Sequence, residues 1–302
     1  MKTYNNLNLN SKHRRGVIAI GNFDGIHLGH QKVINDARRK AKKNRLPFGL
    51  MTFEPVPVMF FNKKIKNHRI NSLEQKKDQL KKLKLDFLIV IKFNKNFSSL
   101  SPEEFIKKII HKKTSCRFLY VSKNFRFGFK RKGNIETLKK YEKQYNFKNV
   151  IVKPFRTKRK TISSTFIRNK IRKGQIEEVN KLLNRNWSIK GKVIKGQKRG
   201  RKIGFPTCNL RLNSYVIPRL GVYAVKVKTN NISNNGIANI GYRPTFNGQS
   251  LLLETNIFGI NKNLYNKVIT VGFKKFLRAE KKFKSFEYLK KQIKIDIKQA
   301  KK

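Results

Sequence analysis

Two histidines, His27 and His30, flank a glycine at the end of the stretch GNFDGIHLGH, which covers residues 21–30. An apolar run at residues 16–20 precedes this stretch, which is therefore predicted to join a buried parallel strand to a helix. Both imidazoles would then share one face of the helix N-terminus, where free backbone N–H groups and the helix dipole favour anions, and Gly29 would let a phosphate approach closely. The spacing predicts phosphate transfer; the alternative is a pair of ordinary capping or surface histidines.

A second motif rich in hydroxyl groups, TISSTFIR, covers residues 161–168. Ser163, Ser164 and Thr165 are residue types that cap helices and contact phosphate, and Arg168 would lie one turn into the helix, within reach of the same anion. Two helix starts of this kind in one domain indicate a nucleoside triphosphate.

The loop NFRFGFKRKG, residues 124–133, follows an expected strand at 118–121. Ligands of open α/β sheets bind at the carboxyl ends of the strands, where this loop would lie. A simple solvent loop would expose its bulky aromatic side chains without reason. The loop is therefore expected to bind a nucleotide or an aromatic ring.

Thr207 and Asn209 follow a glycine-rich basic stretch in the second half of the chain. Two residues apart on a strand, they would share a face and could place a hydroxyl and an amide oxygen on Mg²⁺.

Glu254 adjoins the apolar run 251–253, and burial there would make the carboxylate a better proton acceptor and a candidate general base. A structural ion pair with one of the many cations is the alternative, and the sequence leaves both open.

The periodicity of the chain changes near residue 187. Before residue 187, strands and helices alternate, which predicts a parallel sheet with right-handed crossovers. The expected strands are 16–20, 47–53, 87–93 and 118–121. The expected helices are 33–44, 72–83 and one starting at 101. After residue 187, short strands at 189–194, 222–227, 236–240, 251–258 and 268–276 predict an antiparallel barrel or sandwich. Apolar residues at helical spacing then predict a terminal helix at 283–301.

The composition is strongly basic, with 73 Lys and Arg against 16 Asp and Glu and a formal net charge of +57 in 302 residues. The lysines are spread along the whole chain, which favours solvated faces and compositional drift over a dedicated nucleic-acid site. The positive electrostatic field should nevertheless attract anionic nucleotides.

No apolar run of membrane-spanning length and no signal peptide is evident, so a soluble cytoplasmic protein without a membrane partner is expected. Cys116 and Cys208 are isolated and are expected to be buried, with neither a disulfide nor a zinc site.

Taken together, the motifs resemble those of the prokaryotic bifunctional riboflavin kinase/FMN adenylyltransferases, also called FAD synthetases. Residues 21–30, 124–134 and 161–168 are similar to the adenylyltransferase motifs of that family, and residues 191–210, 217–225, 239–248 and 254–280 are similar to its riboflavin kinase motifs. The ordered matches cover nearly the whole chain.

The resemblance implies a Rossmann-like α/β nucleotidyltransferase domain at residues 1–184, which would transfer AMP from ATP to FMN. His27 and His30 would steady the phosphates of ATP, and Ser163, Ser164, Thr165 and Arg168 would hold the leaving pyrophosphate. The other nucleotide-binding residues implied for this domain are Gly21, Phe23, Asp24 and Asn124, with Phe125 on the flavin.

The same resemblance implies an antiparallel β-barrel riboflavin kinase domain with a C-terminal helix at residues 185–302. There Glu254 would be the base for the ribityl 5′-hydroxyl and Thr207 and Asn209 would hold Mg²⁺. Gly196, Gly200 and Arg201 would bind the nucleotide, and Arg243 and Arg278 the flavin. Riboflavin, FMN and ATP are then the small-molecule partners, and the oligomeric state stays open.

Two alternatives remain at this stage. The first is a nucleotidyltransferase of another specificity, such as a cytidylyltransferase or pantetheine-phosphate adenylyltransferase, or more distantly a class I aminoacyl-tRNA synthetase. Those enzymes lack the GFPTCN and NIGYRPTFNG signatures of the second half. The second is a basic nucleic-acid-binding protein, which would show steep salt-dependent retention on DNA without flavin turnover.

Overall fold

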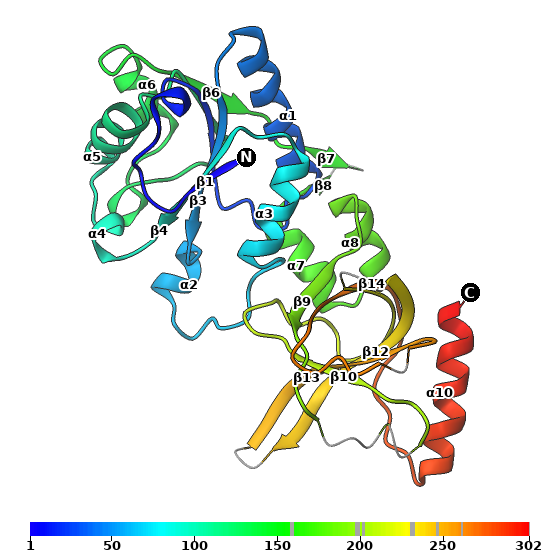
Figure 1. Ribbon diagram of the computed structural model, residues 1–302. Coiled ribbons are helices and arrows are strands. Elements are labelled where there is room, and N and C mark those ends of the chain that lie inside the picture. Colours follow the sequence, from blue (N-terminus) through cyan, green and yellow to red (C-terminus); the bar gives the residue numbers. More distant parts are fainter. Residues whose placement is uncertain are drawn as a thin grey trace. The chain divides into compact units, whose positions relative to one another are not determined.

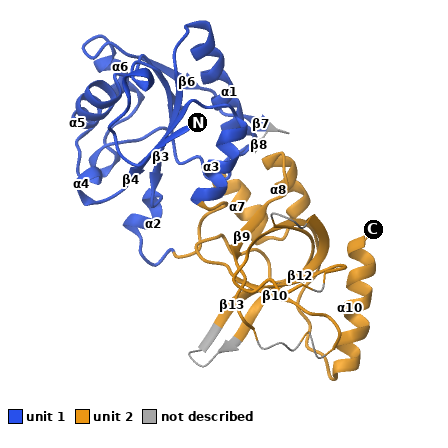
Figure 2. Cartoon of the chain, in the orientation of Figure 1, with its two compact units in different colours: residues 1–65, 73–163 blue, residues 66–72, 164–302 orange. Residues whose placement is uncertain are grey.

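The computed structural model describes residues 1–157, 160–196, 200, 203–229, 233–245, 248–260 and 262–301. Contacts divide the chain into two compact units, one formed by residues 1–65 and 73–163 and the other by residues 66–72 and 164–302 (Figure 2). The chain therefore crosses from one unit to the other at three places.

The first unit is built on a six-stranded sheet whose strands pair in parallel, as the alternating pattern predicted. The strand order is β1-β4-β3-β2-β5-β6. The strands are β1 (Lys2–Tyr4), β2 (Val17–Ile20), β3 (Phe48–Glu54), β4 (Phe87–Lys92), β5 (Phe118–Ser122) and β6 (Lys148–Val152). A separate two-stranded ribbon joins β7 (Arg156–Thr157) to β8 (Lys160–Thr161).

Helices cover both faces of this sheet (Figure 1). Along β2, Ile18 and Ile20 pack into a cluster with the helix η2, whereas Val17 and Ala19 pack into a cluster with α1 and α3. Burial on both faces explains why the strand is a continuous apolar run. The helical segments are η1 (Ser11–His13), α1 (Leu28–Lys43), α2 (Pro57–Phe61), α3 (Leu73–Lys82), α4 (Lys95–Ser98), α5 (Pro102–Glu104), the π-helical η2 (Phe105–Thr114), η3 (Phe129–Arg131) and α6 (Ile135–Glu142).

The second unit holds a six-stranded antiparallel sheet in the order β10-β13-β12-β11-β14-β9. A bridge between Ile194 and Asn209 brings the two edges of this sheet together, so it curls into a nearly closed barrel, as predicted. The strands are β9 (Ser188–Lys192), β10 (Cys208–Arg211), β11 (Gly221–Lys228), β12 (Ser233–Thr245), β13 (Gly248–Ile257) and β14 (Val268–Arg278). The predicted terminal helix is α10 (Phe286–Lys301), which begins three residues later than expected and packs Ile293 and Ile297 on the barrel.

Two further helices, α7 (Ser164–Arg172) and α8 (Ile176–Leu183), belong to the same compact unit as the barrel. The Asn180 side chain of α8 donates to the Phe273 carbonyl at 2.9 Å and accepts from the backbone N–H of Trp187 at 2.7 Å. Residues 66–72 also join this unit: Asn67 donates to the Leu212 carbonyl at 2.9 Å, and the Ile70 carbonyl accepts from the Trp187 indole at 2.8 Å.

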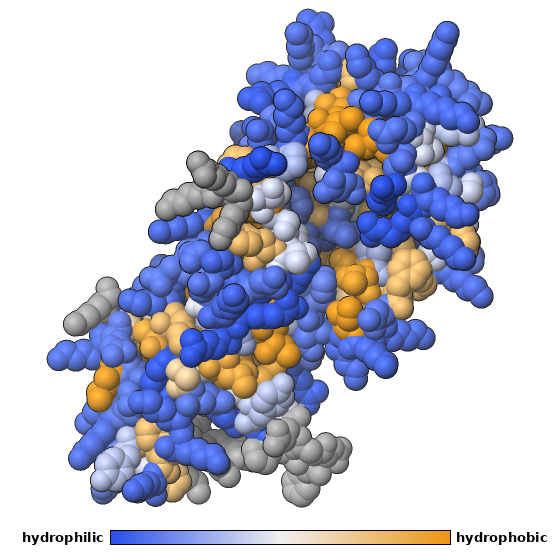
Figure 3. Space-filling model, turned by 180° about the vertical axis from the view of Figure 1, so that it is seen from behind, coloured by the Kyte–Doolittle hydropathy of each residue, from blue (hydrophilic) through white to orange (hydrophobic). Residues whose placement is uncertain are grey.

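The surface is polar over most of the face seen in Figure 3, and the apolar patches on it are small and separate. Within the described residues, no helix combines the length and the apolar character that a membrane span requires. Both cysteines are free; Cys116 is buried as expected, but Cys208 is only half-buried, so that part of the prediction is wrong.

Candidate active sites

The two histidines of the first motif come together at the N-terminus of α1. His27 is the N-cap residue, and its Nδ1 accepts from the backbone N–H of His30 at 3.4 Å. Their rings stack with centroids 3.7 Å apart, and the Phe23 ring lies 5.1 Å from that of His30. This pairing of a cap position with the third helical residue is the geometry that the spacing predicted, and it aims two imidazoles at an anion-binding helix end.

The environment of His30 keeps its imidazole neutral. Burial lowers the pKa of His30 well below its ordinary value of 6.5, and the nearby His27 and Lys76 lower it further. The Nδ1 atom of His30 is enclosed and has no hydrogen-bond partner among the described residues. A neutral ring has one N–H to donate, so the side chain can stabilise a phosphate by a hydrogen bond.

The turn between β2 and α1 holds the other residues expected near the phosphates. The Gly21 amide donates to the Met51 carbonyl at 3.1 Å, which ties the turn to β3. Asp24 is buried, and Phe23 packs into the core beneath α1. Phe23 is therefore held mainly by the protein interior and reaches the site through its contact with the His30 ring.

The second motif forms the start of α7, with Ser164 as its first residue. Arg168 is buried, and its Nη2 donates to the Thr165 hydroxyl at 3.1 Å. Ser163 closes the first compact unit, whereas Ser164, Thr165 and Arg168 lie in the second.

The loop after β5 borders a cavity of about 960 Å³ in the first unit. Asn124 and Phe125 line it, together with the cations Lys123, Arg126, Arg131, Lys139, Lys153 and Arg156 and the single acid Glu136. This excess of positive charge suits an anionic ligand. His27 and His30 are not among the described residues that line this cavity.

The reason given for a ring-binding loop is partly wrong, because the aromatic side chains have partners in the protein. Phe127 is buried in the core and lies 5.1 Å from the Phe105 ring. Phe125 stacks on Phe127 at 5.5 Å, and of these three phenylalanines Phe129 alone is exposed. Core packing accounts for the aromatic side chain of Phe127. Phe125 contacts the core and also lines the cavity, so it remains the candidate for binding an aromatic ring.

A second cavity, of about 650 Å³, opens in the barrel unit between the sheet and α10. Strand register places the key polar residues in one row across it, because Glu254 of β13 pairs with Asn209 of β10 on one side and with Asn239 of β12 on the other. Directly opposed residues of an antiparallel pair share a face. Thr207, Arg243 and Arg278 also line this cavity, so six polar residues meet in one place.

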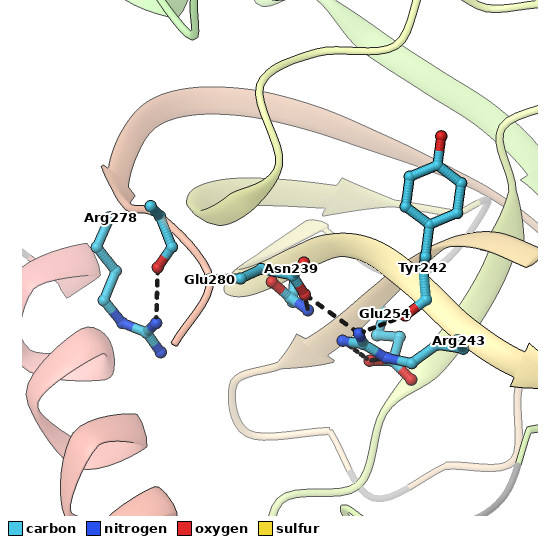
Figure 4. A network of polar contacts seen from close by, with 7 residues as sticks. Asn239, Tyr242, Arg243, Glu254, Arg278 and Glu280 are labelled. Atoms are coloured by element: carbon cyan, nitrogen blue, oxygen red, sulfur yellow. Dashed lines mark hydrogen bonds and ion pairs between the residues drawn. The ribbon is translucent and has the colours of Figure 1, made fainter. Parts of the chain in front are cut away.

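Glu254 is not buried among its apolar neighbours. Its side chain is 28% exposed, because strand alternation turns Leu253 into the core and Glu254 into the cavity. Its Oε2 accepts from Arg243 Nε at 2.9 Å and from Arg243 Nη2 at 2.8 Å (Figure 4). The ion pair that was the alternative interpretation is therefore present, but it lies inside the cavity, so it does not exclude a role as base.

A second carboxylate, Glu280, shares Arg243. It accepts from Arg243 Nη1 at 3.1 Å and from the Asn239 amide at 2.9 Å (Figure 4). Between Asn239 and Arg243 on this face of β12 stands Gly241, and a Cβ there would overlap the Glu280 carboxylate. Glycine at 241 therefore makes the space in which Glu280 meets the two flanking side chains.

Arg278 does not extend freely toward a ligand, because it is bound to α10. Its Nε and Nη2 contact the carboxylate of Asp296 at 2.9 and 2.7 Å, and Asp296 is 1% exposed. Arg278 thus joins the end of β14 to the helix that covers the cavity.

Replacing Asp296 by alanine is expected to lower the free energy of unfolding by about 3 kcal/mol, because a removed partner leaves a largely buried guanidinium uncompensated. Urea titration of the full-length variant measures this loss. The matched control is Glu287→Ala, an exposed acid on the same helix, which should change stability little. Equal stability of the two variants would show that the Arg278–Asp296 pair contributes nothing.

Comparison with known proteins finds family matches for both halves of the chain. The family model described as FAD synthetase matches residues 9–166, and the one described as riboflavin kinase matches residues 183–302. The chain is 42% identical to a bifunctional riboflavin kinase/FMN adenylyltransferase of Buchnera aphidicola subsp. Schizaphis graminum, with 98% of this chain and 96% of the relative covered. The chain belongs to the bifunctional riboflavin kinase/FMN adenylyltransferase family.

Another member of this family, from Haemophilus influenzae, is 40% identical over 94% of this chain and 92% of the relative. Among solved structures, a protein from Streptococcus pneumoniae described as a macrolide-efflux protein aligns with a TM-score of 0.87 and 30% identity, covering 99% of this chain and 98% of that one. That likeness supports the fold, and the assignment to the riboflavin kinase/FMN adenylyltransferase family comes from the sequence matches.

The kinase chemistry of this family implies a divalent cation, and the residues present fit one. Asn209 is buried and its Oδ1 has no hydrogen-bond partner among the described residues. Thr207 lines the same cavity two residues earlier. Mg²⁺ commonly takes one or two protein ligands and completes its shell with phosphate oxygens and water, so Thr207 and Asn209 would be sufficient protein ligands for it.

Gly196 and Gly200 also line the barrel cavity, whereas Arg201 lies outside the described residues. A Cβ at Gly196 would overlap the Asn209 amide, so Gly196→Ala is expected to displace that side chain. Riboflavin phosphorylation should then need a higher Mg²⁺ concentration for half-maximal rate. A Mg²⁺ titration of kinase activity tests this, with FMN-to-FAD conversion by the same protein as the control; an unchanged Mg²⁺ requirement would contradict it.

Sequence reasoning missed four residues that shape these sites: Lys76, Asn239, Glu280 and Asp296. Asp296 had a detectable signal, because acids are scarce in this chain and one on the inner face of the terminal helix needs a partner. Asn239 begins the NIGYRPTFNG stretch, but its position beside Glu254 follows only from strand register. Lys76 had no signal at all, since it stands in a run of polar residues on a helix.

Proposed function

We infer that this chain makes FAD in two ATP-dependent steps, phosphorylating riboflavin to FMN and then transferring AMP from ATP to FMN with release of pyrophosphate. The observation that carries this function is that two family models match the chain side by side, FAD synthetase and riboflavin kinase, and each match contains a polar site. A nucleotidyltransferase of another specificity is not favoured, because it would not account for the riboflavin kinase half.

We propose that adenylyl transfer occurs at the N-terminus of α1. A phosphate oxygen of FMN would attack the α-phosphorus of ATP, and the bond to pyrophosphate would break. His27 and His30 would donate hydrogen bonds to the phosphates as charge develops, and Ser163, Ser164, Thr165 and Arg168 would hold the pyrophosphate. Support comes from the stacked imidazoles at the helix end and from the hydroxyl groups at the start of α7.

Gly21, Phe23 and Asp24 would shape the turn around the nucleotide. Asn124 and Phe125 would bind nucleotide and flavin from the cationic cavity of the first unit. We propose that the adenylyltransferase part extends to residue 184 and the kinase part from 185 to 302, although α7 and α8 pack within the compact unit of the barrel.

For riboflavin phosphorylation, we propose Glu254 as the general base. Its Oε2 accepts both guanidinium bonds from Arg243, so Oε1 is the atom that would take the proton of the ribityl 5′-hydroxyl. The hydroxyl oxygen then attacks the γ-phosphorus of ATP, and the bond to ADP breaks. Arg243 orients the base, and with Arg278 it borders the flavin, while Gly196, Gly200 and Arg201 would contact the nucleotide.

Thr207 and Asn209 would hold Mg²⁺, supported by the buried amide oxygen of Asn209. When bound, Mg²⁺ neutralises charge on the transferring phosphate. We propose a cytoplasmic enzyme because ATP, its co-substrate in both steps, is an intracellular metabolite. Its high positive charge is assigned to solvated faces and attraction of anionic substrates, without a nucleic-acid partner.

The test is to incubate pure protein with ATP and Mg²⁺ and to separate the flavins by chromatography. Riboflavin should give FMN and then FAD, and FMN supplied alone should give FAD and pyrophosphate. A protein that forms neither product from either substrate would reject this function.

A further inference from the structure

Lys76, on α3, is a buried lysine in a chain whose cations lie mostly at the surface. It is 2% exposed and is the only lysine among the buried residues that the structure describes. Removing an ammonium group from water is unfavourable unless it is paired or hydrogen-bonded. An apolar residue would fill this position without that cost, so the retained cation points to a role beyond packing.

The ammonium group of Lys76 binds the backbone just beyond β2. Its Nζ donates to the Asn22 carbonyl at 2.7 Å and to the Thr52 hydroxyl at 3.2 Å. Thr52, fully buried on β3, donates to the same Asn22 carbonyl at 3.1 Å. Two donors from different elements therefore hold one carbonyl oxygen.

That carbonyl begins a turn with an unfavourable backbone. Phe23, Gly25 and Ile26 have φ angles of 45°, 85° and 41°. Side-chain-bearing residues rarely adopt this region, and for β-branched isoleucine it is a true outlier. Such a conformation persists only where the surroundings impose it, and it is frequent at functional sites.

Both ends of the turn are held. At its far end, the Gln31 side chain donates to the Ile26 carbonyl at 2.9 Å, next to the N-cap His27. At its near end, Lys76 and Thr52 hold Asn22. The turn therefore presents His27 and His30 in the position that these bonds define.

We propose that Lys76 is a positioning residue for adenylyl transfer, whose buried ammonium holds the Asn22 carbonyl and thereby the turn that presents His27 and His30. This role rests on the proposed function of the two histidines. The same charge acts on His30 directly: the titratable groups that influence its ring are His27, on the same helix end, and Lys76, and both lower its pKa.

The test compares two full-length variants. Lys76→Met keeps an unbranched side chain of nearly the same length without its charge, and Lys76→Arg keeps the charge. FMN-to-FAD conversion is measured for kcat, for the KM of ATP and across pH. Lys76→Met should lose about 10²-fold in kcat, because small misplacements of catalytic groups have effects of this size. Loss of the positive charge raises the pKa of His30, so the acidic limb of the profile should move to higher pH in Lys76→Met and stay in place in Lys76→Arg.

Riboflavin phosphorylation by the same proteins should be unchanged. A third variant, Thr52→Val, separates the two effects: it weakens the hold on Asn22 but keeps the charge, so kcat should fall without a shift of the acidic limb. This variant also carries the test if Lys76→Met does not fold.

Wild-type kcat and an unmoved acidic limb in Lys76→Met would overturn the role. So would an equal loss of both activities with a lower melting temperature, which is the result expected of a purely structural lysine. Wild-type protein that makes no FAD from FMN would instead reject the proposed function on which this role depends.

Discussion

Glu254→Gln is expected to lower kcat for riboflavin phosphorylation by about 10³-fold, within the range that a positioned general base contributes. Glutamine keeps the shape of the side chain and can still accept a bond from Arg243, but it cannot take the hydroxyl proton. The melting temperature should change little, because the ion pair is about one-third exposed on each side and Arg243 retains Glu280. Initial rates of FMN formation and a thermal melt measure the two quantities.

The matched control is Glu280→Gln, which removes the other carboxylate that binds Arg243 while leaving the base in place. Its kinase activity should exceed that of Glu254→Gln by at least about tenfold, as expected if only Glu254 accepts the proton. Conversion of supplied FMN to FAD should remain normal in both. Normal kinase activity in a destabilised Glu254→Gln protein would show that the pair with Arg243 is structural.

The double change His27→Ala, His30→Ala is expected to reduce FAD formation by about 10²-fold or more, the effect typical of losing one preorganised donor at a developing charge. FMN should still accumulate from riboflavin, because the barrel cavity contains neither residue. The ratio of FMN to FAD in a timed reaction measures this directly.

His111→Ala provides the control for loss of a histidine outside the site. His111 lies on η2, is exposed and contacts the Tyr145 ring. Its removal should leave both activities at wild-type levels. If the double variant makes FAD as fast as His111→Ala does, the assignment of the two imidazoles is wrong.

Local patterns in the sequence predicted the main elements. The β-branched run before His27 is β2, and the spacing of the two histidines placed them at the start of α1. The helix start at Ser101 is confirmed by its capping box with Glu104. These signals are local, because a strand end, a cap and a helix face are set by a few neighbouring residues.

Among the elements that the sequence analysis missed, β1 and β10 have no local signal. β1 has the sequence Lys-Thr-Tyr and exists because it pairs with the apolar strand β4. β10 is short and begins inside the motif that was interpreted as a Mg²⁺ site. Its pairing with β13 holds it in the sheet. Tertiary pairing decides such strands more than intrinsic preference does.

In the sites, too, local spacing could be predicted from the sequence, whereas contacts that depend on strand pairing could not. Sequence spacing put Thr207 beside Asn209, but the row from Asn209 through Glu254 to Asn239 depends on the register of three strands. The partner of Glu254 could not be identified among 73 basic residues without that register. Likewise, nothing in the composition of α3 distinguishes the buried Lys76 from its half-buried neighbour Lys77.

The segment 66–72 has a consequence for the order in which the chain can fold during synthesis. It leaves the ribosome well before residues 164–302, with which it packs, so its contacts must wait until the barrel has been made. Until then residues 66–72 can remain an open loop between Ile65 and Leu73, at the modest entropic cost of a short loop. The parallel sheet can meanwhile assemble from the residues before and after this loop. A kinase fragment made from residue 164 onward would lack the Ile70 carbonyl that binds the Trp187 indole. The barrel therefore completes its packing only on a chain that has already supplied this earlier segment.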